Sequence, residues 1–384
     1  MNLLTPLLLL LTAGYLLFLY TMYRGFKRVS RQLPMPSHTG EPPFISVIVP
    51  ARNEAKTIQA CLASIFAGTY PPHRFEVLVV NDLSTDDTCA QVEAFSRTLK
   101  PEDRQRLRLL HMPENLLRTR AHKKRAIQKG IQSARGSWIV TTDADCILPP
   151  DWLHTLSQYF QEGTHMVSGP TAFLHRTYTE RMMALEFLGL VSIGAGAIGA
   201  GKPILCNGAN LAYRKDTFHR VGGFRNIDHL TSGDDELLMQ KIAHHFPGSV
   251  AFCAHPEALV WTQPPRSLRE FLEQRKRWAS KGAHYPDKKL VMLNTGLYLF
   301  FLTLGITSVL SLAIPGLLPY VAGAWGAKMF GEYLFLKTGA EHFGLSHLLR
   351  TFLPAQLFHV PYIMYAGLAG FLFPYEWKDR EIVR

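Results

Sequence analysis

Apolar residues in this chain gather in long uncharged stretches near both ends and in short runs between them. Residues 2–23, 290–327 and 351–375 contain no Asp, Glu, Lys or Arg. A helix of about 20 such residues crosses the roughly 30 Å hydrocarbon layer of a bilayer. Pro315 and Gly316 interrupt the second stretch and favour two spans within it. The pattern therefore predicts a transmembrane anchor at residues 1–23 and about three further spans within residues 287–376.

Basic residues set the orientation that we expect for the anchor. A signal peptide would carry basic residues before the apolar stretch, whereas here they follow it, at Arg24, Lys27, Arg28 and Arg31. We therefore interpret the stretch as an uncleaved anchor. The basic linker 24–43 and the residues after it are then expected in the cytosol. The span around Lys328 and Glu332 suits a re-entrant or interfacial segment best, and the charged tail 377–384 is expected outside. We predict an integral, multi-pass protein of the bacterial inner membrane.

Short apolar runs alternate with helical patterns in the middle of the chain. The runs 44–49, 76–80 and 138–142 predict strands. Helices are predicted at 53–67, at 123–134, and from near Asp86 with Ser84 as its cap. This alternation favours one α/β domain, residues 44–286, with a mixed, mostly parallel sheet. Ligands bind beyond the carboxyl ends of such strands, where this chain places Arg52 to Glu54, Asp82, and Asp143 to Asp145.

The formal net charge of +11 favours acidic partners, and nucleic acid is one class to weigh. The basic residues gather after the anchor, in 118–125 and in 266–281, without a nucleic-acid-binding motif. We therefore expect membrane lipids and phosphates as partners, and no nucleic acid. The five cysteines lack CxxC spacing and indicate neither a zinc site nor a disulfide framework; they are Cys61, Cys89, Cys146, Cys206 and Cys253.

Asp143 and Asp145 flank one residue directly after a predicted strand. Two carboxylates at that spacing can hold Mg²⁺ or Mn²⁺ against the phosphates of a nucleotide. An ordinary turn is the alternative interpretation. The apolar run before the pair, Pro149 and Pro150 after it, and the nearby strand end at Asp82 favour the metal site.

The order of these groups resembles that of the family 2 inverting glycosyltransferases, which have the GT-A fold. The segment 46–54 resembles the family's first strand and nucleotide-binding loop, and so implies donor contacts from Pro50, Asn53 and Glu54. The segment 79–88 resembles the second strand, with Asp82 near the base and ribose. Asn81 and Leu83 replace a usual Asp and Gly there, which leaves the identity of the base open.

Further along the chain, the segment 122–126 resembles the family's Gly-Lys segment, with Lys123 beside the donor phosphates and His122 in place of Gly. Residues 142–145 match the metal motif, which implies Mg²⁺ or Mn²⁺ at Asp143 and Asp145, with Asp143 also at the donor. The segments 206–214 and 221–224 resemble the acceptor side of the site.

Asp234 and Asp235 occupy the place of the family's Glu-Asp motif. By this resemblance Asp235 is the general base, because an inverting transfer needs a carboxylate that takes the proton of the acceptor hydroxyl. The alternative is a helix N-terminus after Ser232, where acidic residues are also favoured. The order of the motifs along the chain favours catalysis.

The run from Gln274 to Trp278 matches the family's Gln-x-x-Arg-Trp motif in full. On a helix, Gln274, Arg277 and Trp278 share one face and are expected to cover the diphosphate and the sugar. An interfacial amphipathic helix is a second interpretation, and the two are compatible.

Two other patterns are set aside. Residues 194–199 satisfy GxGxxG but follow a helical stretch rather than a strand, so we reject a dinucleotide site. Their small side chains indicate a close-packed or membrane-facing helix that lines the acceptor entrance. His244 and His245 lack zinc-protease spacing and are expected to be surface or packing residues.

The resemblance implies a membrane hexosyltransferase with a cytosolic GT-A domain. It would move a sugar with inversion from a nucleotide sugar, expected to be UDP-linked, to a lipid or glycan acceptor hydroxyl. A processive polysaccharide synthase is the alternative within the enzyme class, although about four spans are few for a polymer channel. A catalytically silent scaffold that binds nucleotide sugars would not need Asp235, and a nucleotidyltransferase would not need Gln274 to Trp278.

Overall fold

The computed structural model describes residues 3–32, 41–113, 121–230, 232–280, 285, 287–373, 375–377 and 380–382. The chain forms two compact units. The first unit comprises Met1–Phe26, His175–Ser192 and Pro264–Arg384, and the second comprises Lys27–Leu174 and Ile193–Gln263.

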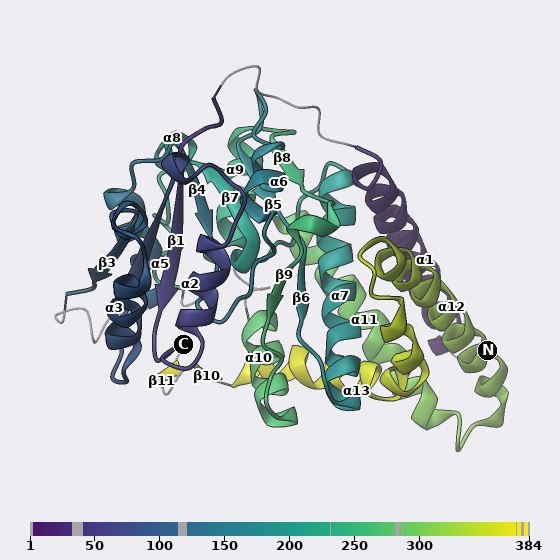
Figure 1. The fold of residues 1–384 in the computed structure, drawn as a ribbon. Helices are drawn as coiled ribbons and strands as arrows, with labels where there is room; N and C mark the ends of the chain where they lie inside the picture. Colours follow the sequence, from purple (N-terminus) through teal and green to yellow (C-terminus); the bar gives the residue numbers. More distant parts are fainter. Residues whose placement is uncertain are drawn as a thin grey trace. The chain divides into compact units, whose positions relative to one another are not determined.

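The second unit contains a mixed sheet, whose strands follow the order β3-β2-β1-β4-β7-β5-β8 in the described residues (Figure 1). The strands are β1 (Ile45–Ala51), β2 (Phe75–Asn81), β3 (Leu107–His111), β4 (Trp138–Thr141), β5 (Met166–Ser168), β7 (Leu211–Arg214) and β8 (Val250–Phe252). β7 runs antiparallel to β4 and β5, and the other neighbouring pairs are parallel. The predicted mixed, mostly parallel sheet is confirmed. A second pair, β6 (Thr171–Phe173) and β9 (Val260–Thr262), is parallel.

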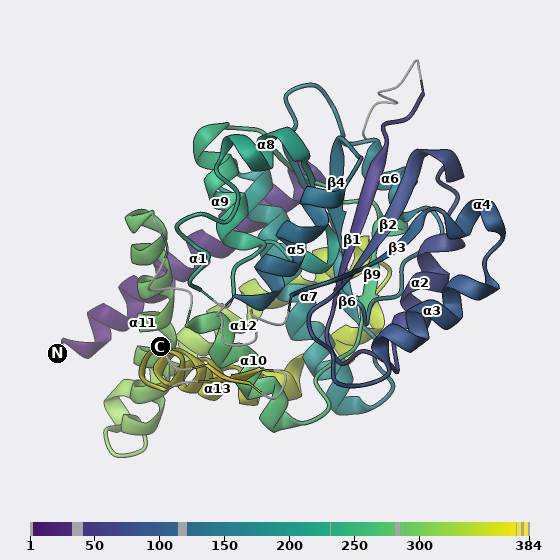
Figure 2. The same cartoon turned by 90° about the vertical axis from the view of Figure 1, so that its left-hand side faces the viewer.

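Helices cover both faces of this sheet. α2 (Ile58–Phe66) and α3 (Thr88–Thr98) lie on one side of β1 and β2, and α5 (His122–Ser133) lies on the other (Figure 2). Alternate residues of β1 divide between the faces: Val47 and Val49 join the core with α2, whereas Ile48 packs on Gly130 of α5. A Cβ at Gly130 would lie 2.7 Å from Ile48 Cγ2, so glycine permits this close approach. The remaining helices of the unit are α4 (Pro101–Arg104), α6 (Trp152–Ser157), α8 (Lys215–Arg220) and α9 (Glu236–His245).

The three predicted strands and the helix at 123–134 are confirmed as β1, β2, β4 and α5, with ends that differ by one or two residues. The predicted helix at 53–67 begins five residues later, at Ile58, because Asn53 adopts a φ of 52° in a loop. The prediction that Ser84 caps the next helix is wrong. That helix, α3, begins at Thr88, and the Ser84 hydroxyl instead accepts a hydrogen bond from the Asn53 N–H.

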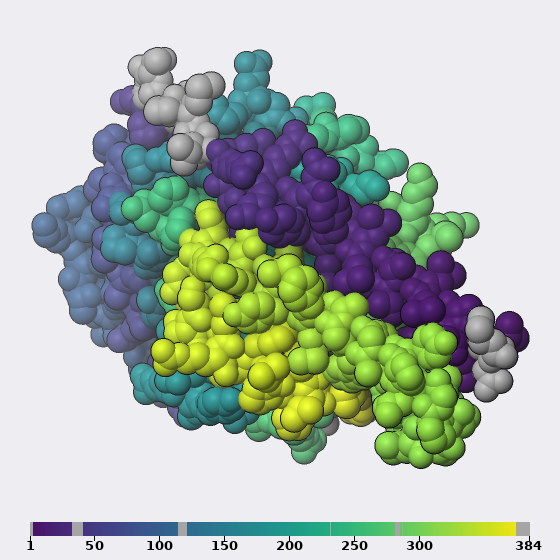
Figure 3. Space-filling view, turned by 90° about the vertical axis from the view of Figure 1, so that its right-hand side faces the viewer, coloured from purple at the N-terminus to yellow at the C-terminus, as the bar shows by residue number. Residues whose placement is uncertain are grey.

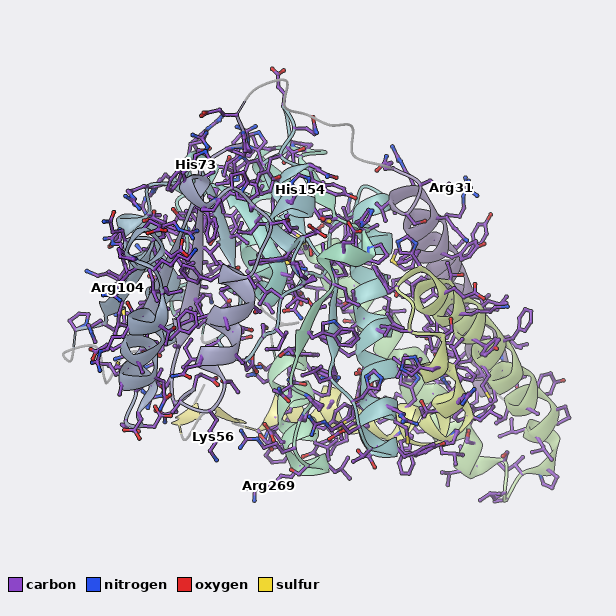
Figure 4. All side chains as sticks on the ribbon, viewed as in Figure 1. Arg31, Lys56, His73, Arg104, His154 and Arg269 are labelled. Carbon is purple, nitrogen blue, oxygen red and sulfur yellow. The ribbon has the colours of Figure 1, made fainter. Side chains whose placement is uncertain are left out.

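The two ends of the parallel strands are marked in Figure 4. Lys56 follows β1, and His73 precedes β2 at the opposite end of the sheet. The polar residues predicted to bind ligands lie at the Lys56 end, because they follow β1, β2 and β4.

The first unit is largely helical. Its helices are α1 (Leu4–Val29), the greater part of α7 (Tyr178–Gly199), α10 (Leu268–Ala279), α11 (Lys288–Leu310), α12 (Leu318–His342) and α13 (Phe352–Leu372). The short turns η6 (Pro315–Leu317) and η7 (Ser346–Thr351) connect the last three helices, and β10 (Tyr375–Trp377) pairs with β11 (Arg380–Ile382). α1 runs beside the C-terminal helices (Figure 3), and its Tyr15 hydroxyl donates to Glu332 of α12 at 2.5 Å. α1 continues six residues past the predicted anchor.

Three helices among the described residues are long and apolar enough to cross a membrane by length and composition: Leu4–Arg31, Tyr178–Gly199 and Lys288–Leu310. The first and last coincide with predicted spans. The second was predicted only as a close-packed or membrane-facing helix. α12 and α13, both predicted as spans, are not among the three, since each carries polar residues within it. The break at Pro315 and Gly316 is confirmed as η6.

Lys328 and Glu332 lie inside a continuous helix rather than in a re-entrant break. Lys328 is 0% exposed, and its ammonium donates to Glu332 at 2.9 Å and to Gln356 of α13 at 2.5 Å. Gln356 in turn donates to Glu332 at 2.9 Å. Both charges are therefore compensated inside the first unit.

Candidate active site

The loop after β1 is attached to the loop after β2 at the carboxyl end of the sheet. Backbone N–H groups of Asn53, Glu54 and Ala55 donate to the side chains of Ser84, Thr88 and Asp86 at 2.8–3.1 Å. Asn53 Oδ1 accepts from the Thr85 N–H in return, at 2.9 Å. The segment predicted to contact the donor therefore has a defined conformation, and the Glu54 carboxylate accepts a hydrogen bond from Thr57.

Asp82, predicted to lie near the base and ribose, is buried at the end of β2. Its Oδ1 lies 3.1 Å from Nδ1 of His122, the first residue of α5. The residue that replaces the family's glycine is thus in contact with the predicted nucleoside carboxylate. The contact of Asp82 with a nucleoside stays a prediction.

Lys123 connects two of the predicted acidic groups. Its Nζ lies 2.7 Å from Asp143 Oδ1 and 3.3 Å from Asp234 Oδ2. Burial alone would lower the pKa of Lys123, but the carboxylates of Asp143, Asp234 and Asp235 outweigh it and raise that pKa above its ordinary value. α5 thus places a cation between the carboxyl end of β4 and the start of α9.

Asp235 is both the predicted base and the N-cap of α9, so the helix-terminus interpretation holds for its backbone position. Its Oδ1 accepts from the Glu236 N–H at 2.7 Å, and its Oδ2 accepts from the Gly208 N–H at 3.1 Å. Asp235 is partly exposed, whereas Asp234 is buried. Each carboxylate oxygen can accept more than one hydrogen bond, so these contacts orient Asp235 and leave acceptor capacity for a hydroxyl.

Asp143 and Asp145 are partly exposed on either side of the buried Ala144. Burial raises the pKa of the Cys61 thiol, and the negative charges of Asp145, Asp143 and Glu54 raise it further. No group of three His, Cys, Asp or Glu residues suited to a metal occurs in the part of the chain that the structure describes. Two partly exposed carboxylates nevertheless suit Mg²⁺ or Mn²⁺ when substrate phosphates and water complete the ligand set.

The roles of two residues at this site were not predicted. Gly208 lies within the predicted acceptor-side segment 206–214, and a Cβ on it would lie 3.2 Å from Asp234 Oδ2. Lys124 is 1% exposed and bonds three backbone carbonyls ahead of Asp234. A glycine within a segment of small residues was a usable sequence signal for a close approach of the chain at Gly208. The sequence around Lys124 gave no signal that this lysine is buried, because it lies on a helix with several basic residues.

The Gln-x-x-Arg-Trp motif lies on α10 of the first unit, and the predicted helix is confirmed. Gln274, Arg277 and Trp278 are partly exposed, and the intervening Arg275 and Lys276 are buried. Arg275 forms an ion pair with Glu186 of α7, and its guanidinium lies 4.3 Å from the Trp278 ring centroid. The basic residues at 275 and 276 therefore do not form the exposed polar face that an interfacial helix needs.

The two patterns set aside both lie on helices. Residues 194–199 are the end of α7, and a Cβ on Gly194 would lie 2.7 Å from the Leu205 carbonyl oxygen, which confirms close packing. His244 and His245 are exposed at the end of α9. Residues 118–120 of the predicted basic cluster lie outside the described residues.

Comparisons with known proteins agree with this arrangement. Residues 46–222 match the model of glycosyl transferase family 2, and residues 138–371 match that of glycosyl transferase family group 2. The chain is 31% identical over 236 residues to the glycosyltransferase AglE of Haloferax volcanii, covering 61% of this chain and 71% of AglE. It is 22% identical over 270 residues to the poly-beta-1,6-N-acetyl-D-glucosamine synthase of Staphylococcus epidermidis, covering 69% of this chain and 60% of that protein.

Among solved structures, the mannosyltransferase PcManGT of Pyrobaculum calidifontis, in complex with GDP-Man and Mn²⁺, has the same fold. Its TM-score is 0.60 at 24% identity, covering 95% of this chain and 99% of that one. The α/β architecture is therefore the GT-A type. Because the family group model alone spans more than half of the sequence, the chain belongs to glycosyltransferase family 2 and is an enzyme that transfers a sugar from a nucleotide-sugar donor.

Proposed function

We propose that this enzyme transfers a hexose with inversion from a UDP-linked or related nucleotide sugar to the hydroxyl of a lipid or lipid-linked acceptor. The observation that supports this most is the ion-pair network of Asp143, Lys123 and Asp234, with Asp235 beside it. It gathers, at one sheet edge, a cation for the leaving diphosphate and a carboxylate for the acceptor proton. A scaffold that only binds nucleotide sugars has no use for the second group.

Each residue then has one task. Asp235 accepts the proton of the acceptor hydroxyl while that oxygen bonds the anomeric carbon. The bond from this carbon to the diphosphate breaks on the opposite side, so the configuration inverts. Lys123 compensates the charge that develops on the diphosphate. Asp234 holds the Lys123 ammonium, and Asp82, Asn53, Glu54 and Pro50 line the nucleoside side.

A divalent metal fits the donor set described above. Asp143 and Asp145 would hold Mg²⁺ or Mn²⁺, and the metal supplies charge compensation to the phosphates when it is bound. The Mn²⁺ and GDP-Man of PcManGT support this assignment and also require GDP-sugars among the donors to be tested. Gln274, Arg277 and Trp278 are assigned to the donor through the family motif.

The apolar helices support a lipid acceptor and a multi-pass enzyme in the bacterial inner membrane, with the GT-A domain in the cytosol. Leu4–Arg31 and Lys288–Leu310 lie on either side of the second unit in sequence. Arg24, Lys27, Arg28 and Arg31 at the end of the first helix favour a cytosolic position for the GT-A domain. Membrane lipids are then the acceptor or its surroundings.

The deciding experiment is nucleotide release by the purified protein in native lipid extract, from UDP-, GDP- and dTDP-sugars with Mg²⁺ or Mn²⁺. Release from one donor class that depends on the extract and is lost in Asp235→Asn supports the proposal. Mass analysis of the extracted lipid then identifies the product. Release that Asp235→Asn leaves unchanged would contradict the assigned base.

Processive polymer synthesis is the second candidate, favoured by the match to the Staphylococcus epidermidis synthase. It predicts a ladder of products that lengthens with time. One added sugar per acceptor would exclude it.

A further inference from the structure

Lys124 is a buried cation that the proposed reaction does not use. It lies on α5 directly after Lys123, and it is 1% exposed. Its Nζ lies 2.7 Å from the Ile227 carbonyl oxygen, 2.7 Å from that of Leu230 and 2.6 Å from that of Ser232. An ammonium has three N–H donors, so these carbonyls occupy all of them.

The three carbonyls belong to the segment that leads into the proposed base. Ser232 is followed by Gly233, whose φ is 83°, and then by Asp234 and Asp235. Gly233 packs tightly, because a Cβ on it would lie 2.6 Å from Leu237 Cδ1. A shift of the Ser232 carbonyl therefore passes to Asp234 and Asp235 through a short turn.

Asp235 is held from its other side by the Gly208 N–H and by the first turn of α9. Asp234 is held by Lys123. Consecutive lysines of α5 thus act on consecutive parts of one segment: Lys123 on a carboxylate, and Lys124 on the backbone before it.

We propose that Lys124 is a positioning residue, whose ammonium fixes the backbone at Ile227, Leu230 and Ser232 so that Asp235 meets the acceptor hydroxyl in the reactive geometry. The inference rests on the proposed role of Asp235 as the base. Lys124 touches no reacting atom, so its loss acts through Asp235.

Lys241 is partly exposed and provides a control of the same chemical kind. Its ammonium also binds two backbone carbonyls that precede Asp235 in the sequence, those of Gly223 and Arg225, at 2.5 and 2.9 Å. These carbonyls are separated from Asp235 by more residues than Ser232 is. Lys124→Met and Lys241→Met each replace an ammonium by an apolar group of similar length. Both leave backbone carbonyls without that donor, which lowers stability in each case.

The experiment measures nucleotide release, thermal midpoint and hydrogen exchange of the full-length protein in the same lipid extract, at a temperature where both variants are folded. We expect Lys124→Met to lower kcat by about tenfold to a hundredfold, because a small misplacement of a catalytic group has that effect. The donor KM should change less than about threefold, and exchange should accelerate across residues 227–235. Lys241→Met should keep kcat within about threefold of the wild type, and its loss of stability should be smaller because Lys241 is partly exposed and binds two carbonyls rather than three.

A wild-type kcat in Lys124→Met, or a loss no larger than that of Lys241→Met, would overturn the proposal. If Lys124→Met does not fold, Lys124→Arg replaces it. Arginine keeps the charge but has a different donor geometry, so we expect a smaller loss of kcat, again with an unchanged donor KM. Asp235→Asn runs in parallel: if it stays active, the assigned base is wrong. If it is inactive while the Lys124 variants keep kcat, only the positioning role fails.

Discussion

Asp235 Oδ2 accepts a hydrogen bond from the backbone N–H of Gly208 at 3.1 Å, across 27 positions of the sequence. The carbonyl of Gly208 accepts in turn from the Thr141 hydroxyl, at 2.8 Å, on β4. The proposed base is therefore tied to a central strand through one glycine. A rigid attachment of this kind favours a precise position for a catalytic carboxylate.

Gly208→Ala tests how closely this attachment must be kept. The new Cβ would lie 3.2 Å from Asp234 Oδ2, so the Asp234 carboxylate must shift by a few tenths of an ångström, and it would lie 3.4 Å from Lys123 Nζ, which is the partner of that carboxylate. We expect kcat for nucleotide release to fall by about tenfold, with little change in thermal midpoint. A wild-type kcat would show that the ion-pair network tolerates the shift.

Asp235→Asn removes the proposed base and also one acceptor. The amide NH₂ of asparagine would face either the Gly208 or the Glu236 N–H, which costs about 1–3 kcal/mol of stability for the unpaired group. We expect sugar transfer to fall by at least about a hundredfold, the usual effect of losing a general base. Binding of the nucleoside diphosphate, measured by calorimetry, should persist. Its loss would show that Asp235 takes part in binding the donor instead.

Lys123→Met separates the role of the cation from that of the carboxylates it bridges. We expect the donor KM to rise by about tenfold or more, because the diphosphate loses a charged partner. Mn²⁺ should bind the variant more tightly than the wild type without nucleotide, since Asp143 no longer pairs with an ammonium. Titration of Mn²⁺ by paramagnetic resonance measures this, with the exposed Lys129→Met of the same helix as control. Equal Mn²⁺ affinity in all three proteins would contradict the competition.

Three strands of the sheet, β1, β2 and β4, were predicted because each is a short apolar run that ends in polar residues. The strands β3, β5, β7 and β8 were not predicted. The start of α2 was not predictable, because the positive φ of Asn53 depends on hydrogen bonds from the loop after β2, about 30 residues away. The acidic groups of the site were found by their order along the chain. Lys124 could not be found, since its partners are backbone carbonyls about 100 residues later, which no side-chain pattern encodes.

The membrane helices show the same limit of local pattern. α7 is apolar enough to cross a membrane, yet 67% of its most apolar window is buried inside the protein. Burial by protein and burial by lipid favour the same residue types, so composition alone does not separate them. Lys328 illustrates the converse, because its compensating partners Glu332 and Gln356 become visible only in the folded chain.

The cysteines provide a test of the folded state. Cys61, Cys146 and Cys253 are 0% exposed, and burial raises the pKa of each thiol, that of Cys253 to about 12. None of the five cysteines, all of which the structure describes, forms a disulfide. We expect maleimide at pH 8 to modify only the partly exposed Cys89 and Cys206 in the native protein, because the thiolate is the reactive form. Peptide mapping by mass spectrometry measures which cysteines are modified. Rapid modification of Cys61 would contradict its burial in the core.

Arg275 and Glu186 form a buried ion pair that connects α10 to α7 within the first unit. The guanidinium contacts both carboxylate oxygens of Glu186, and its remaining nitrogen donates to Gln274 Oε1 at 2.5 Å. The Tyr362 hydroxyl of α13 donates to the same carboxylate at 2.7 Å. Removal of one member of such a pair leaves the other charge buried and uncompensated.

We therefore expect Glu186→Gln to lower the free energy of unfolding by about 3–5 kcal/mol, and Tyr362→Phe by about 1 kcal/mol. The double variant Glu186→Leu with Arg275→Met should lose less stability than the sum of the losses in the single variants Glu186→Leu and Arg275→Met, because neither charge is then left alone. Thermal unfolding in one detergent measures all of these proteins. Additive losses in the double variant would show that Arg275 and Glu186 are not coupled, and that other contacts orient Gln274 and Trp278 on α10.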